Sequence, residues 1–152
     1  MTFQVDDPEF DDGPSPYVGL TIEGQRRALR YLRNPKEKIL QYLSDDGATL
    51  VIDYPLRNGP SEVHVPRLPS GEYTRVDLIR MIGASYRMIY QEERETSTLA
   101  EESCAQRYGG FLMNRAATNG KWGIWGHDLS DLLLHTITLD VANKKLHLGI
   151  DS

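Results

Sequence analysis

Hydrophobic residues recur along the chain with the period of a helix in some stretches and with the period of a strand in others. The longest helical pattern runs from Thr74 to about Glu93. Thr74 and Asp77 have the spacing of a capping box, which places the start of this helix at Thr74. Its apolar residues lie three and four positions apart, at Leu78, Ile79, Ile82, Tyr86, Ile89 and Tyr90. We expect this helix to lie across a sheet as its main packing partner.

Four shorter segments carry helix-start signals, since a capping residue precedes each of them. Thr21 precedes a segment with Ile22, Ala28, Leu29 and Leu32 on one side. The other three are Asn34-Pro35-Lys36-Glu37, whose apolar face is Ile39, Leu40 and Leu43; Thr98 to about Arg107; and Asp128 followed by 129–133.

Alternation of apolar and polar residues predicts four strands in two hairpins. The strands are Thr49–Tyr54, Glu62–Val65, Thr136–Val141 and Lys145–Ile150, with Pro66 ending the second and Ala142-Asn143 at the last turn. The sequence therefore predicts an α+β fold: a small antiparallel sheet of about four strands packed against two to four helices. The order of the two hairpins in the sheet stays open.

Two further stretches have no regular period. Residues 1–17 contain five carboxylates and three prolines and are expected to be a disordered acidic tail, which leaves residues 18–152 as one α+β domain. Residues 109–126 contain five glycines and are expected to form a long irregular loop before the C-terminal hairpin.

The composition excludes several classes of protein. The single cysteine, Cys104, rules out an internal disulfide and a CxxC zinc site. The net charge of −5 argues against a surface that binds nucleic acid as a whole. The acidic N-terminus does not resemble a signal peptide, and no apolar run has membrane-spanning length, so we expect an intracellular protein of the cytoplasm or nucleus.

Both tryptophans of the chain lie in the predicted loop, in Gly120-Lys121-Trp122-Gly123-Ile124-Trp125-Gly126. With Phe111 and Met113 nearby, Trp122 and Trp125 are candidates to line a groove for a peptide or a flat ligand, because Trp and Met suit adaptable interfaces. Alternatively, these side chains fold back as a lid over an open flank of the sheet.

A second candidate site is the trio His127, Asp128 and Asp131, which has ligands for a metal ion and a group that can act as a general base. The alternative is that Asp128 caps a helix while His127 bonds a backbone group. No P-loop, dinucleotide fingerprint, nucleophile elbow or His-Glu-x-x-His motif is present, and no cofactor is expected. A nucleophilic role for Cys104, beside Glu101 and Glu102, is not expected.

A third candidate is a basic stripe on the first predicted helix. Arg26, Arg30 and Arg33 are four and three residues apart, with Arg27 beside them. Such a stripe meets phosphates in nucleic-acid-binding proteins, but it is also the ordinary solvated face of a helix. A further hypothesis is that the acidic tail folds onto the stripe.

The leading hypothesis is a non-enzymatic domain that binds another protein, or a second copy of itself, through the aromatic glycine-rich loop. The first alternative is a small metal-assisted hydrolase centred on His127, Asp128 and Asp131. The second is nucleic-acid binding through the four arginines.

Overall fold

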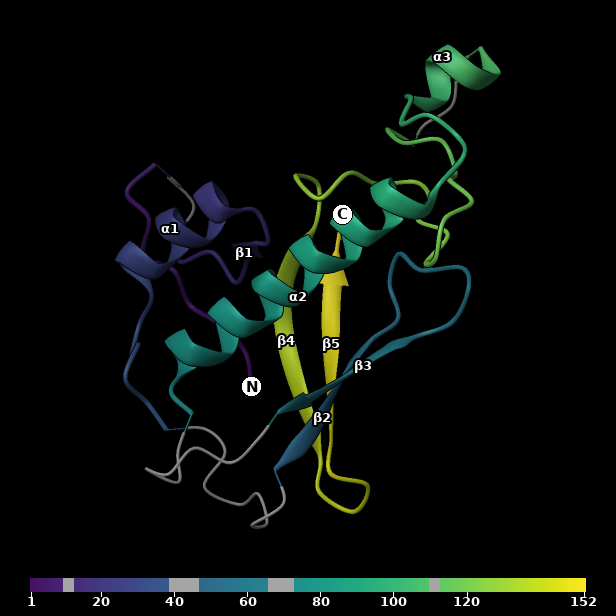
Figure 1. Ribbon diagram of the computed structural model, residues 1–152. Coiled ribbons are helices and arrows are strands. Elements are labelled where there is room, and N and C mark those ends of the chain that lie inside the picture. Colours follow the sequence, from purple (N-terminus) through teal and green to yellow (C-terminus); the bar gives the residue numbers. More distant parts are fainter. Residues whose placement is uncertain (10–12, 39–46, 66–72, 110–112) are drawn as a thin grey trace.

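The computed structural model describes residues 1–9, 13–38, 47–65, 73–109 and 113–152. Over these residues the chain forms one five-stranded sheet and three helices, which confirms the α+β class. Helix α2 (Arg75–Thr96) crosses one face of the sheet (Figure 1). Helix α3 (Cys104–Tyr108) lies beyond the C-terminal end of α2, at the opposite end of the molecule from the turn between the last two strands.

The sheet differs from the expected one in strand number and direction. Its strands are β1 (Val18–Gly19), β2 (Ala48–Ile52), β3 (Ser61–Val65), β4 (Leu133–Asp140) and β5 (Lys145–Asp151), in the order β1-β4-β5-β2-β3. The pairs are antiparallel except that β2 and β5 run parallel, so the sheet is mixed. The fifth strand, β1, is only two residues long, too short to produce a visible alternation.

Both predicted hairpins are present and join along one apolar row. Leu50 of β2 pairs with Val63 of β3 on one side and with Leu146 of β5 on the other, and Leu146 pairs with Leu139 of β4. Leu50 and Leu146 are fully buried. The parallel contact therefore brings together the apolar faces of the two hairpins in one surface.

Helix α2 packs on this surface and forms the centre of the core. Its buried apolar side chains are those that the spacing predicts: Leu78, Ile79, Ile82, Tyr86, Ile89 and Tyr90. The capping box of Thr74 and Asp77 is confirmed, because each side chain accepts from the backbone N–H of the other residue. The Tyr86 hydroxyl donates to the carbonyl of Tyr54 over 2.9 Å, which satisfies the one polar group of this buried ring.

The shorter helices follow their signals less closely. Helix α1 (Ile22–Tyr31) has the predicted Thr21 cap. The chain over 98–102 is not helical; α3 begins at Cys104, where Ser103 and Gln106 form the capping box. None of the helices in the described ranges is long and apolar enough to cross a membrane.

Two predicted helix starts do not lead to helices. Residues 34–38 form turns and a bridge, and the apolar face assigned to Ile39, Leu40 and Leu43 lies outside the described residues. Residues 129–131 form a turn, and β4 follows directly. Here strand pairing overrides the Asp128 cap signal, because Leu134 pairs with Val18 of β1 and both side chains are fully buried.

The N-terminal segment, expected to be disordered, packs against the domain over its described residues, 1–9 and 13–17. Phe3 and Val5 are buried in the core. Val5 exchanges two backbone hydrogen bonds with Ser15, and the N-terminal ammonium group donates to the carbonyl of Ile137. The prediction of disorder rested on the acidic composition and overlooked the alternation of Phe3 and Val5, whose side chains point inward.

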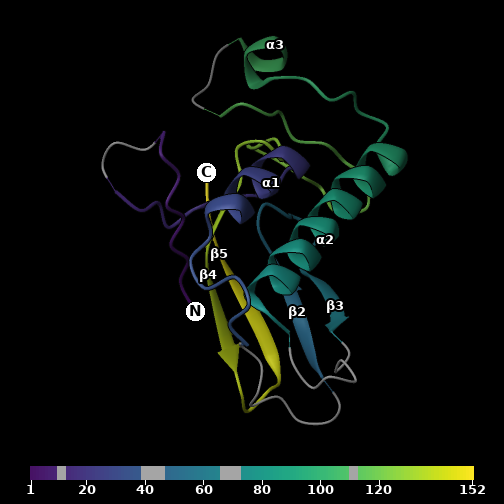
Figure 2. The same cartoon turned by 90° about the vertical axis from the view of Figure 1, so that its left-hand side faces the viewer.

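Helices α1 and α2 touch through a glycine, and Figure 2 shows them side by side. Gln25 of α1 is buried, and its side-chain amide donates to the carbonyl of Ile79 over 2.5 Å. A Cβ atom at Gly83 would lie 1.9 Å from the Gln25 amide nitrogen. The position of the Gln25 side chain between the helices therefore requires a glycine at position 83.

Replacing Gly83 with alanine is expected to lower the free energy of unfolding by about 1–2 kcal/mol. The methyl group displaces the Gln25 amide and breaks a buried hydrogen bond, and this loss exceeds the gain of up to about 1 kcal/mol in helix propensity. In a Gln25→Ala background the same substitution is expected to be neutral or stabilising. Urea denaturation of the four proteins of this double-mutant cycle measures the coupling. Equal effects of Gly83→Ala in both backgrounds would contradict this account.

Candidate functional site

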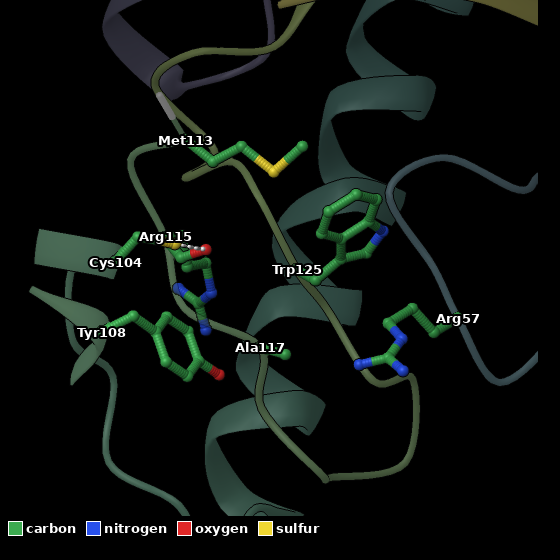
Figure 3. Close-up of a pocket in the computed structure, with 7 residues that line it drawn as sticks. All are labelled: Arg57, Cys104, Tyr108, Met113, Arg115, Ala117 and Trp125. Atoms are coloured by element: carbon green, nitrogen blue, oxygen red, sulfur yellow. Dashed lines mark hydrogen bonds between the residues drawn. The ribbon is translucent and has the colours of Figure 1, made fainter. Parts of the chain in front are cut away.

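One candidate site is a cavity of about 530 Å³ between α3, the irregular segment 113–126 and the connection from β2 to β3. It is lined by Arg57, Cys104, Tyr108, Met113, Arg115, Ala117 and Trp125 (Figure 3). Figure 3 shows the Trp125 ring and the Met113 side chain on one side of the cavity, while the ends of Arg57 and Tyr108 point inward from opposite sides. The volume is within the range of ordinary ligand pockets.

The predicted aromatic site is divided by the structure. Trp125 and Met113 line the cavity and are 40% and 36% exposed. Trp122 instead packs against the core, its indole N–H donates to Glu92, and the Lys121 ammonium group lies 4.5 Å from its ring centre. Phe111 lies outside the described residues. Trp122 therefore packs inward, whereas Trp125 faces the cavity.

Glu93 is the residue that sequence reasoning missed. It is fully buried near the end of α2, and its carboxylate accepts backbone N–H groups of Gly120, Trp122 and Gly123 over 2.8, 2.8 and 3.0 Å. Burial acts to raise the pKa of Glu93, but hydrogen bonds from Thr118 and from these backbone groups hold it below its ordinary value. The sequence contains a signal for the burial of Glu93, because this residue lies three positions after Tyr90, where the apolar stripe of Tyr86, Ile89 and Tyr90 continues.

The glycines of the predicted loop make this arrangement possible. A Cβ atom at Gly120 would lie 2.7 Å from the Glu93 carboxylate and from its backbone carbonyl. Gly123 has a φ of 65°, a conformation that other residues rarely adopt. Two glycines thus let the backbone run close enough to α2 to surround the carboxylate.

Arg115 forms a second buried polar centre under the cavity. Its guanidinium group donates to Glu101 and to Asp128, each over 3.0 Å, and lies 5.5 Å from the centre of the Tyr90 ring. Burial acts to lower the pKa of Arg115, but the two carboxylates raise it above its ordinary value, so the group stays charged. Cys104 donates its thiol hydrogen to the Arg115 carbonyl over 3.1 Å, a structural role for the lone cysteine.

The His127, Asp128 and Asp131 side chains do not gather around a common point for a metal ion. Asp128 is engaged by Arg115, and Asp131 accepts from Asn114 and from the Asp128 backbone N–H. His127 lies 3.3 Å from the Ser152 hydroxyl. Within the described ranges, no group of three or more His, Cys, Asp or Glu residues is placed to hold a metal.

The four arginines of the basic stripe are split into two pairs. Arg27 is bound by Asp7 and Glu9, and Arg33 by Asp6, so the N-terminal segment covers this part of the stripe. Hydrogen bonding to Arg27 holds the pKa of Asp7 below its ordinary value. Arg26 and Arg30 form no ion pair with the described residues of the N-terminal segment, 1–9 and 13–17, and line a separate groove beside α2. The hypothesis that the acidic segment folds onto the stripe is confirmed for Arg27 and Arg33.

Comparisons with protein-family models, with curated proteins and with solved structures found no match to this chain.

Replacing Glu93 with glutamine is expected to destabilise the protein by about 2–3 kcal/mol at pH 7, because an amide removes the charge and turns one acceptor into a donor facing N–H groups. Urea denaturation measures the loss. Glu95→Gln, an exposed change on the same helix, serves as the control and is expected to stay within about 0.5 kcal/mol of the wild type.

The advantage of the carboxylate at position 93 also depends on pH in a defined direction. Since the native pKa of Glu93 lies below the ordinary value of 4.5, the stabilisation is complete above about that pH and is lost as the pH falls through the native pKa. The stabilities of wild type and Glu93→Gln should therefore converge in acid. A difference that is independent of pH would contradict the assigned hydrogen bonds.

Proposed function

We propose that this chain is a protein-binding domain and that the cavity beside Trp125 receives a short segment of a partner protein. The observation that carries the proposal is the clustering of exposed apolar side chains at one place. Within the described residues, eight large apolar side chains are exposed, and three of them, Tyr108, Met113 and Trp125, border this cavity. Exposed aromatic and methionine side chains that gather around a hollow are typical of binding surfaces.

The charge of the cavity indicates what the partner segment carries. None of its described lining residues carries a carboxylate, and Arg115 is neutralised by Glu101 and Asp128. Arg57 is exposed and makes no side-chain hydrogen bond or ion pair with any residue that the structure describes. A segment with an apolar side chain for Trp125 and a carboxylate for Arg57 is complementary to this surface.

The site is held in place before any partner binds. The backbone N–H groups of Arg57 and Asn58 donate to the carbonyl of Trp122, and Leu56 forms a bridge with Ile124. The Glu93 carboxylate fixes the same segment from the other side. Preorganisation of this kind lowers the conformational entropy lost on binding.

The test is selection from a displayed library of random peptides. We expect the selected peptides to combine an acidic residue with an aromatic or aliphatic one. Trp125→Ala should weaken their binding by about 30-fold, the effect of a central interface residue, and Arg57→Gln by about 10-fold. Met88→Ala, which removes a comparably exposed apolar side chain from α2, should leave binding unchanged. Fluorescence anisotropy with labelled peptides measures each affinity.

Two outcomes would overturn the proposal. The first is that peptides are enriched equally by the wild type and by Trp125→Ala. The second is a dimer in sedimentation velocity that Trp125→Ala dissociates, because the occupant of the cavity would then be a second copy of this chain.

A further inference from the structure

A second hollow of about 410 Å³ lies between α1 and α2, away from the cavity described above. Four arginines line it, Arg26 and Arg30 from α1 and Arg80 and Arg87 from α2. The apolar side chains of Ile22 and Leu29 complete its α1 wall, and over the part of the chain that the structure describes no carboxylate is among its lining residues. Four like charges placed together without a lining counter-charge repel one another unless an anion joins them.

Three arginines of this groove, Arg26, Arg30 and Arg80, form no strong ion pair with the residues that the structure describes. Arg30 and Arg80 make no hydrogen bond or ion pair with the described part of the chain, although their charges contribute to lowering the pKa of Asp7 and of Asp77. The one ion pair of Arg26 within the described ranges is with Glu23, three residues before it, and both side chains are more than half exposed. Exposed pairs of this kind contribute little and are easily exchanged.

One arginine of the groove is held in position by the contact between the two helices. The Arg87 guanidinium donates to the side-chain oxygen of Gln25 over 3.1 Å and to the carbonyl of Leu20 over 3.3 Å. Gln25 is fixed in turn by its bond to Ile79, in the space that Gly83 leaves. The base of the groove is therefore preorganised, while Arg26, Arg30 and Arg80 are exposed.

We propose that this groove binds a compact anion that carries two or more phosphate groups. Guanidinium groups bind phosphate oxygens with paired N–H donors, and the volume suits a small ligand. A long nucleic-acid strand fits less well, because the chain has a net charge of −5 and Asp7, Glu23 and Asp77 lie around the groove. The covered arginines, Arg27 and Arg33, are unavailable to extend the basic surface.

The experiment is calorimetric titration with inorganic tripolyphosphate. The double variant Arg30→Gln/Arg80→Gln should bind about 10- to 100-fold more weakly than the wild type, because it loses two charged donors. The double variant Arg94→Gln/Lys144→Gln has the same change in net charge outside the groove and should bind like the wild type. Thermal unfolding confirms that both variants are folded. Binding should weaken as salt is added.

Three results would overturn the proposal. Tripolyphosphate does not bind to the wild type, or both double variants lose affinity equally, which would reflect net charge alone. The third is that a labelled single-stranded oligonucleotide binds more tightly than tripolyphosphate and depends on Arg30 and Arg80. In that case the groove binds the phosphates of a nucleic-acid strand. Because Trp125 is not part of this groove, the result is independent of the peptide selection.

Discussion

The buried carboxylate of Glu93 attaches the irregular segment before the last hairpin to the helix that forms the centre of the core. Glu93 accepts three backbone N–H groups from one turn of the 120–123 segment, so it ties an irregular stretch of chain to the end of α2. A buried charge is costly unless hydrogen bonds or an opposite charge compensate it, and here the donors are backbone groups that would otherwise lack partners away from water. The close approach of this segment to Glu93 also requires a glycine at position 120, because a side chain there would collide with the Glu93 carboxylate.

The cavity beside Trp125 depends on this attachment. The segment that Glu93 holds continues to Trp125, and it is bonded on its other side to the connection that carries Arg57. Arg115 closes the base of the cavity by joining Glu101, Asp128 and the ring of Tyr90. Its Nε atom, buried and without a hydrogen-bond partner in the described structure, shows that this centre is held by its two outer nitrogens. Two buried ionic centres thus support one exposed apolar surface.

Charge is distributed in a similar way at the other end of the molecule. Three acidic residues of the N-terminal segment, Asp6, Asp7 and Glu9, bind Arg27 and Arg33, while Phe3 and Val5 enter the core. The segment covers one side of α1 and leaves Arg26 and Arg30 facing α2. A chain with a net charge of −5 therefore has a basic groove that the described part of the N-terminal segment leaves open, which neither the net charge nor the spacing of the arginines reveals.

The sequence by itself determined the local elements: the α2 helix and its capping box, the Thr21 cap and the two hairpins, because periodicity and capping are properties of neighbouring residues. The tertiary structure alone decided that the hairpins meet in parallel, since alternation specifies the faces of a strand and not its direction. It also separated Trp122 from Trp125 and engaged Asp128 and Asp131 with Arg115 and Asn114. These contacts join residues far apart along the chain, and only packing decides which of several polar partners each one meets.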